Sequence, residues 1–187
     1  MHRNEPTCPT VLRMMLSYKP DSGEFSWKPR PPWMFTASAT GRGRKTPEAL
    51  SRTWNARYAG LPAFTRLVNG YTNAIVCDTN IRAHRAAWAI SHGYWPKTDI
   101  DHINRDRGDN RIANLRLATR SQNCHNRTVK DEAWRGAYFD KRRGTWFTMV
   151  TLHGKSKYHG PYASKAEASA AYRLQSSLVY GEFTPTT

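Results

Sequence analysis

The order of short segments between residues 100 and 126 constrains the fold of this chain most. A strand, a polar loop and a second strand are predicted there in succession, at residues 100–103, 104–113 and 114–118. Thr119 and Gln122 then have the spacing of a capping box, in which each side chain accepts a hydrogen bond from the other residue's backbone N–H. A helix is therefore expected to begin at Thr119.

Both apolar and polar side chains in this segment have expected structural roles. Leu115 and Leu117 alternate along the second strand and are predicted on its buried side. Asn114 lies where the loop rejoins this strand, and its amide is expected to bridge loop backbone groups. Four further polar residues are predicted to form turns: Asn104, Asp106, Asp109 and Asn110. Asp109 and Asn110 could instead contact a metal.

An acid and an imidazole are adjacent in the first strand. Asp101 precedes His102, and the expected helix returns Asn123 toward this pair. Phosphodiester hydrolysis needs a base for water and a cation at the leaving oxygen, and imidazole titrates near neutral pH. Asp101 and Asn123 offer hard oxygens, which suit Mg²⁺ or Mn²⁺ better than zinc. A purely structural His102 is the alternative.

The composition favours a polyanionic partner. Lys and Arg outnumber Asp and Glu 29 to 14, which gives a formal net charge of +15. Seven Trp and nine Tyr argue against a disordered basic tail. The three cysteines form no CxxC pair, so neither a zinc knuckle nor a disulfide framework is expected. No apolar run reaches membrane-span length and the first residues lack a signal-peptide core, so we expect no membrane association and a cytoplasmic, unsecreted protein.

The first 93 residues predict small elements and one basic segment. A helix is expected at 11–18 and a strand at 24–27; paired strands follow the Asn69-Gly70 turn at 71–77 and 80–83, and a helix at 84–92 ends at Gly93. Residues 29–47 combine prolines with Arg42, Arg44 and Lys45. This segment fits either an arm that follows a phosphate backbone or a solvated loop.

The last third predicts a three-stranded antiparallel sheet and one helix. The strands are expected at residues 136–139, 145–152 and 157–162. A second capping box at Ser164 and Glu167 begins the helix, which carries Ala170, Ala171, Leu174 and Leu178 at helical spacing and ends at Gly181. One sheet and one amphipathic helix can bury a face of each.

The segment 101–126 resembles the HNH endonucleases, in their phage homing-endonuclease branch. The matching motifs are DHIN, DNR, NLR, a Thr and QN, in that order. The resemblance implies a ββα-metal motif and metal-dependent cleavage or nicking of double-stranded DNA. It makes His102 the general base, Asn114 the central Asn, and Asp101 and Asn123 the metal ligands, with Asn123 standing where other branches carry the final His.

The upstream segments 54–60 and 83–85 also resemble the N-terminal part of such enzymes. His84 and Arg85 fit either a phosphate contact or a packed helix start. Asn110 and Thr119, like Asn114, are expected to support the site. Five basic side chains are expected to contact DNA in this part of the chain: Arg85, Arg105, Arg111, Arg116 and Arg120.

Residues 135–183 resemble an AP2-type DNA-binding domain. The matching signs are Arg135-Gly136-Ala137, Trp146, Gly160-Pro161-Tyr162, the Ala-rich helix and the segment 180–183. That family lays its sheet in the major groove, which implies a DNA-facing set here of Arg135, Tyr138, Arg142, Arg143, Thr148 and Lys155. Tyr138 and Asp140 stand where Arg is usual, so no base preference carries over.

Together these observations predict an α+β protein with three parts. Residues 1–53 form a helix, a hairpin and a basic arm; residues 54–130 form an HNH nuclease domain with its core at 99–127; residues 131–187 form an AP2-like domain. A monomer would nick DNA, and a homodimer would cut both strands. If the phage-type resemblance holds, the protein acts in the cytoplasm of a bacterial host. A catalytically inactive DNA-binding regulator and an RNA-binding or RNA-cleaving protein are the alternatives.

Overall fold

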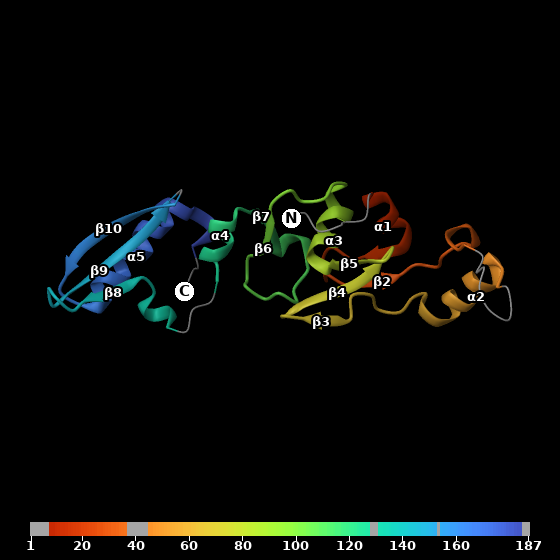
Figure 1. Ribbon diagram of the computed structural model, residues 1–187, viewed down its shortest axis with the longest axis horizontal. Helices are drawn as coiled ribbons and strands as arrows, with labels where there is room; N and C mark the ends of the chain where they lie inside the picture. The colour runs from red at the N-terminus through yellow and green to blue at the C-terminus, as the bar shows by residue number, and fades with distance from the viewer. Residues whose placement is uncertain (1–7, 37–44, 128–130, 153, 185–187) are drawn as a thin grey trace. The chain divides into compact units, whose positions relative to one another are not determined.

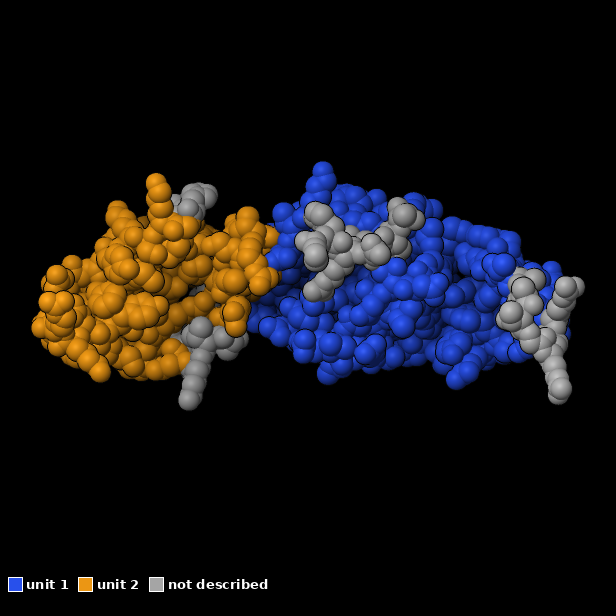
Figure 2. All heavy atoms as spheres, in the orientation of Figure 1, with its two compact units in different colours: residues 1–117 blue, residues 118–187 orange. Residues whose placement is uncertain are grey.

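The computed structural model describes residues 8–36, 45–127, 131–152 and 154–184, and it mixes helices with small sheets as an α+β protein should (Figure 1). The chain divides into two compact units, residues 1–117 and 118–187 (Figure 2). Neither predicted domain boundary coincides with this division. Within the described ranges, no helix is long and apolar enough to cross a membrane.

Unit 1 contains short helices and three small sheets. Strands β1 and β2 form an antiparallel hairpin, β3, β4 and β5 form an antiparallel sheet in that order, and β6 is hydrogen-bonded to β7. The elements in chain order are α1 Pro9–Met15, β1 Leu16–Tyr18, β2 Phe25–Trp27, the 3-10 helix Pro32–Met34, α2 Pro47–Tyr58, β3 Arg66–Val68, β4 Tyr71–Val76, β5 Thr79–Arg82, α3 Ala83–His92, β6 Asp99–His102, the 3-10 helix Ile112–Asn114 and β7 Leu115–Ala118.

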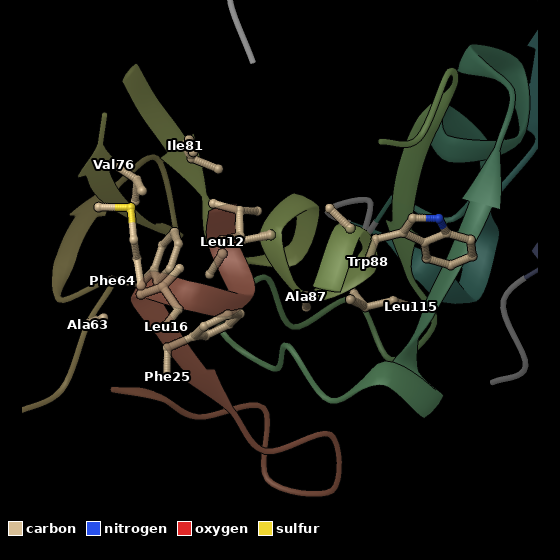
Figure 3. Close-up of a cluster of buried hydrophobic side chains, with 14 of the residues drawn as sticks. Leu12, Leu16, Phe25, Ala63, Phe64, Val76, Ile81, Ala87, Trp88 and Leu115 are labelled. Atoms are coloured by element: carbon tan, nitrogen blue, oxygen red, sulfur yellow. The ribbon is translucent and has the colours of Figure 1, made fainter. Parts of the chain in front are cut away.

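The core of unit 1 lies between α1, α3 and the strands around them (Figure 3). Leu12 and Leu16 are almost fully buried, and the alanines on α3 let this helix approach its neighbours closely. Trp88 from α3 and Leu115 from β7 extend the same cluster toward β6. Gly93 ends α3 in the left-handed conformation, as predicted. This core supports β6, whose residues 100–102 are all buried.

Three sequence expectations for unit 1 need correction. The helix predicted at 11–18 ends at Met15, because Leu16–Tyr18 pairs with β2 instead. Helix α2 and strand β3 were not predicted, although Thr46 caps α2 and Pro47 occupies its first turn. Leu117 is 39% exposed, because only Leu115 of this pair reaches the core. Residues 37–44 of the basic segment, which include Arg42 and Arg44, lie outside the described residues.

Unit 2 contains the predicted three-stranded antiparallel sheet, in the order β10, β9, β8, and a long helix packed on it. Its elements are α4 Arg120–His125, the 3-10 helix Glu132–Trp134, β8 Ala137–Asp140, β9 Thr145–Leu152, β10 Lys155–Tyr162, α5 Lys165–Tyr180 and the 3-10 helix Gly181–Phe183. Ser164 caps α5 by accepting from the Glu167 N–H, but the Glu167 carboxylate accepts from Ala163 N–H, so the second capping box is incomplete.

The buried side of α5 differs from the predicted one. Leu174 and Leu178 are 65% and 80% exposed, whereas Tyr172 and Tyr180 are buried with Val150 of β9. The other buried residues of α5 are small, Ala168, Ser169 and Ser176, and these let the helix approach the sheet closely. The rings of Tyr172 and Tyr180 therefore occupy the buried side of the helix, and the two leucines lie on the exposed side.

Gly136 is expected to be essential for this packing. It has φ +75°, and a Cβ on it would lie 2.0 Å from Cγ of Tyr172. Gly136→Ala should lower the free energy of unfolding by about 3 kcal/mol, the sum of overpacking and left-handed strain. Gly144→Ala is the matched control, with φ +67° and nothing within 4 Å. Its free energy of unfolding, measured in urea, should fall by only about 1 kcal/mol. Equal losses of stability in the two variants would contradict the packing argument.

Candidate functional site

Strand β6 carries the adjacent acid and imidazole. Asp101 and His102 are each 4% exposed, because both faces of this strand are covered. A buried carboxylate is costly unless it is paired. Arg116 on the neighbouring strand β7 supplies that partner: its Nε and Nη2 each lie 2.8 Å from Asp101 Oδ2. Arg116, which was predicted to contact DNA, forms a buried ion pair instead.

His102 sits among aromatic rings. Its ring centroid lies 5.1 Å from that of His84 and 6.0 Å from that of Tyr71. Burial lowers the pKa of His102, while the neighbouring Asn110 amide and the nearby carboxylates, beginning with Asp101, act in the raising direction. The imidazole is therefore favoured in its neutral form, which can accept a proton.

His84 belongs to the packed start of α3. It is 4% exposed, and burial together with the charges of His102 and Arg82 holds its pKa well below the ordinary value. Arg85 donates to the backbone carbonyls of Pro96 and Thr98, at 2.9 and 3.4 Å. The structure thus favours the packing alternative for His84, while Arg85 connects α3 to the segment before β6.

Asn114 closes the loop between the two strands. Its Oδ1 accepts from the Asn104 backbone N–H at 3.0 Å, and its Nδ2 donates to Asn104 Oδ1 and to the carbonyl of Asp109. The Asn114 carbonyl also accepts from Ile103 N–H. These contacts hold the loop ends together behind His102.

Local hydrogen bonds shape the rest of the loop. Asp109 accepts hydrogen bonds from Arg111 Nε and Nη2 at 2.8 and 2.6 Å. These hydrogen bonds are the main reason why the pKa of Asp109 is lowered to about 2. Asp106 Oδ1 accepts from Gly108 N–H, a turn-forming contact. Arg105 has φ +68°, and its N–H donates to the carbonyl of His102. Of the two predicted DNA contacts here, Arg111 is half exposed but already paired.

Several contacts near His102 were not predicted from the sequence. Arg82 and Arg107 place their guanidinium carbons 4.6 and 5.0 Å from the ring centroid of Tyr71. Asn110 donates to Thr72 Oγ1 at 3.3 Å. The Arg82 contact joins the neighbouring strands β4 and β5, whereas the Arg107 and Asn110 contacts join β4 to residues far along the chain, so no local motif predicts the latter two.

Unit 2 holds the helix that follows β7. Thr119 Oγ1 accepts from Gln122 N–H and Gln122 Oε1 accepts from Thr119 N–H, so the predicted capping box is confirmed. Asn123 is half-buried in the first turn, where its N–H donates to the Thr119 carbonyl. Arg120 is exposed at the first helical position. Asp101 and His102 belong to unit 1, and Asn123 belongs to unit 2.

The predicted DNA-facing residues of the sheet divide into two groups. Tyr138, Arg142 and Arg143 are exposed. Thr148 is fully buried beneath α5, and its prediction as a DNA contact is wrong, because the register places it on the face that the helix covers. Lys155 is exposed, but it lies two residues before Lys157, which pairs with the buried Val150, so Lys155 also lies on the helix side of the sheet.

Arg135 forms structural hydrogen bonds within unit 2. Its guanidinium donates to the backbone carbonyls of His125 and Arg127. The ring of His125 packs against Tyr180, and burial, followed by the charge of Arg135, lowers the pKa of His125 to about 4. Arg135 therefore joins the end of α4 to the start of β8.

The described residues contain no group of three or more His, Cys, Asp or Glu side chains that could hold a metal ion. The predicted donors, Asp101, His102 and the amides, include oxygens that suit a hard cation. Both Arg116 contacts fall on the same carboxylate oxygen of Asp101. A cation at Asp101 would therefore share this carboxylate with Arg116.

Comparison with known proteins supports a nuclease. Residues 82–125 match the family model described as HNH endonuclease, which covers α3, β6, the loop, β7 and α4. No curated protein and no solved structure matched the chain. The segment 82–125 is similar to the HNH endonucleases, and this similarity points to nuclease activity on DNA.

Removal of Arg116 should destabilise the protein, because Asp101 would then be buried without a partner. Arg116→Ala leaves a buried carboxylate without its cationic partner and should lower the free energy of unfolding by about 3–5 kcal/mol. Arg111→Ala removes a pair whose Arg side chain is 52% exposed and should cost about 1 kcal/mol or less. Urea unfolding of both variants measures the difference. A loss for Arg116→Ala as small as that for Arg111→Ala would contradict the buried ion pair.

Proposed function

We propose that this protein is a metal-dependent endonuclease of the homing type that hydrolyses phosphodiester bonds in double-stranded DNA. The observation that carries the proposal is the buried Asp101–His102 pair, which lies inside the segment that matches the HNH endonuclease family. A strongly basic chain, with a net charge of +15, suits a polyphosphate substrate.

His102 acts as the general base in this proposal. Its burial favours the neutral imidazole, which accepts a proton from the attacking water. The nearby carboxylates, beginning with Asp101, stabilise the imidazolium that forms. A divalent cation, Mg²⁺ or Mn²⁺ rather than zinc, would be held by Asp101 and Asn123 and would stabilise the charge that develops on the leaving oxygen.

Unit 2 is proposed as an AP2-like DNA-binding module. Tyr138, Arg142 and Arg143 are exposed, and they are the residues of the predicted set best able to reach DNA. The remaining candidates have structural contacts or lie on the helix side of the sheet. As a monomer the enzyme would nick one strand, and as a homodimer it would cut both, in the cytoplasm of a bacterial host.

One observation favours a second candidate function. The Asp101–Arg116 ion pair gives Asp101 a structural role that a catalytically inactive DNA-binding regulator would also retain. The two candidates make opposite predictions about cleavage, because only the nuclease depends on a base at position 102.

The cleavage test uses supercoiled plasmid with Mg²⁺ and compares the native protein with two variants. His102→Ala should lose cleavage by about 10²–10⁴-fold, the usual worth of a general base. Asn123→Ala should also lose cleavage yet retain DNA affinity, and EDTA should stop the native protein. Equal plasmid relaxation by the native protein and His102→Ala would reject the nuclease, and lost affinity in Asn123→Ala would make Asn123 a structural residue.

The binding test examines the exposed basic turn of the sheet. Arg142→Ala combined with Arg143→Ala should weaken duplex binding and reduce the slope of log K against log salt by about 2, one for each lost phosphate contact. Arg173→Ala, which removes a charge from α5, should leave the slope unchanged; its guanidinium donates to the carbonyl of Ala133. Stronger competition by RNA than by duplex DNA would favour the RNA alternative.

A further inference from the structure

The sheet of unit 2 has two different faces. Helix α5 packs on β8, β9 and β10 (Figure 1), and Thr148 and Val150 of β9 are buried beneath it. Side chains alternate between the faces of a strand, so Phe147 and Met149 point away from the helix. The strand register extends this second face, called the open face below, to Tyr138, Asp140, Thr145, Phe147, Met149, Thr151, Ser156 and Tyr158.

Three aromatic rings form a row across the open face. Tyr138 of β8 pairs directly with Phe147 of β9, and their ring centroids lie 5.5 Å apart with 27° between the ring planes. Tyr158 of β10 is a diagonal neighbour of Phe147, at 6.0 Å between centroids. Each strand therefore contributes one ring, and the aromatic row, Tyr138, Phe147 and Tyr158, crosses the whole sheet.

The two ends of the aromatic row are strongly exposed. Tyr138 is 46% exposed and Tyr158 is 67% exposed, whereas Tyr172 and Tyr180 on the covered side are 8% and 7% exposed. Cross-strand aromatic pairs stabilise a sheet, which explains why the rings contact one another. It does not explain why a tyrosine that makes one tilted ring contact leaves most of its surface in solvent. Contiguous exposed apolar surface of this kind marks a binding site.

The chemistry of the open face suits unpaired bases. None of its described residues is Arg, Lys, Asn or Gln, the side chains that read base edges in the grooves of a duplex. Aromatic rings instead stack on the faces of bases, and in a duplex those faces are covered by the neighbouring base pairs. Single-stranded nucleic acids are recognised by rings presented in this way on sheets and in grooves.

Positive charge lies beside the aromatic row, at the β8–β9 turn. Lys141, Arg142 and Arg143 are exposed there, and Lys141 follows Tyr138 by three residues, about 10 Å along an extended chain. The carboxylate of Asp140 accepts hydrogen bonds from the backbone N–H groups of Arg142 and Arg143, which fixes the turn. The cations of this turn are therefore placed to meet the phosphates of a strand whose bases lie on the rings.

We infer that the aromatic row binds an unpaired segment of a DNA strand, with its rings stacked on the bases and the β8–β9 turn beside the phosphates. The inference rests on the proposed role of unit 2 in binding DNA, and it goes beyond that role because it specifies the state of the strand. Such a surface retains a strand that lacks its complement, whereas the nuclease segment acts on the duplex.

Affinity for a single strand tests the stacking. The full chain is titrated, in EDTA, against a labelled oligonucleotide of about 12 thymidines, which do not pair with one another, and anisotropy gives the Kd. Tyr158→Ala should raise the Kd about tenfold, the usual loss for one stacked base, whereas Tyr158→Phe keeps the ring and should bind like the native protein. An unchanged Kd for Tyr158→Ala would overturn the inference.

Two neighbouring residues of β8 provide the matched control. Tyr138 and Phe139 are 46% and 48% exposed, but Phe139 pairs with Trp146 and so lies on the opposite face of the sheet. Tyr138→Ala should raise the Kd for the single strand about tenfold, whereas Phe139→Ala should leave it unchanged. Equal losses of affinity in the two variants would contradict a binding site on the open face.

Salt dependence and a duplex of the same length separate stacking from charge. Tyr158→Ala should leave the slope of log K against log salt unchanged, because a ring releases no counterions. Arg142→Ala combined with Arg143→Ala should reduce the single-strand slope by about 1.4, or about 0.7 for each phosphate contact. Equal weakening of duplex and single-strand binding by Tyr158→Ala would overturn the inference and leave the duplex-binding proposal intact. Failure of the native protein to bind either DNA would instead reject the proposed role of unit 2.

Photocrosslinking of the native protein decides the question even if an alanine variant does not fold. An oligonucleotide of iodinated deoxyuridines is irradiated in the complex, and the crosslinked peptides are identified by mass spectrometry. We expect crosslinks at Tyr138, Phe147 or Tyr158, and crosslinks confined to other residues would overturn the inference. Tighter binding of an oligonucleotide of uridines than of thymidines would overturn the assignment to DNA.

Discussion

The buried ion pair between Asp101 and Arg116 is the interaction on which the centre of unit 1 depends. It joins β6 to β7 with both charges withdrawn from solvent, and such a pair stabilises only when its geometry is good. Any shift of the two strands would leave a carboxylate buried alone, so the pair specifies how they align. His102 follows Asp101 directly, and its position is therefore tied to the same alignment.

Much of the fold followed from local sequence rules, and the errors share one physical cause. The capping box at Thr119 and the end of α3 at Gly93 depend on neighbouring residues alone, and both were predictable. Leu174 and Thr148 were misplaced because burial depends on which face of an element meets another one. Helical spacing identifies a row of apolar residues, but it does not choose between two rows when one contains tyrosines with room to pack.

The candidate site divides in the same way. Asp101 and His102 are conspicuous because they are adjacent and precede a run of amides. Asn110 was predicted as a turn former and as a residue that supports the site, but its contacts with Tyr18 of β1 and Thr72 of β4 could not be predicted from the local sequence. Arg116 read as a DNA contact for a similar reason: a basic residue on a strand looks accessible until the carboxylate opposite it is known.

The hydrogen bond between Tyr18 and Asn110 also bears on how the protein folds. Contacts between residues so far apart in sequence close a large loop, and they form late because the entropy of closure must first be overcome. Local elements such as α3 and the capped α4 can form earlier, whereas the loop beside His102 is completed only when the first hairpin docks. Until that hairpin docks, the loop beside His102 stays incomplete, so catalytic competence would serve as a reporter of complete folding.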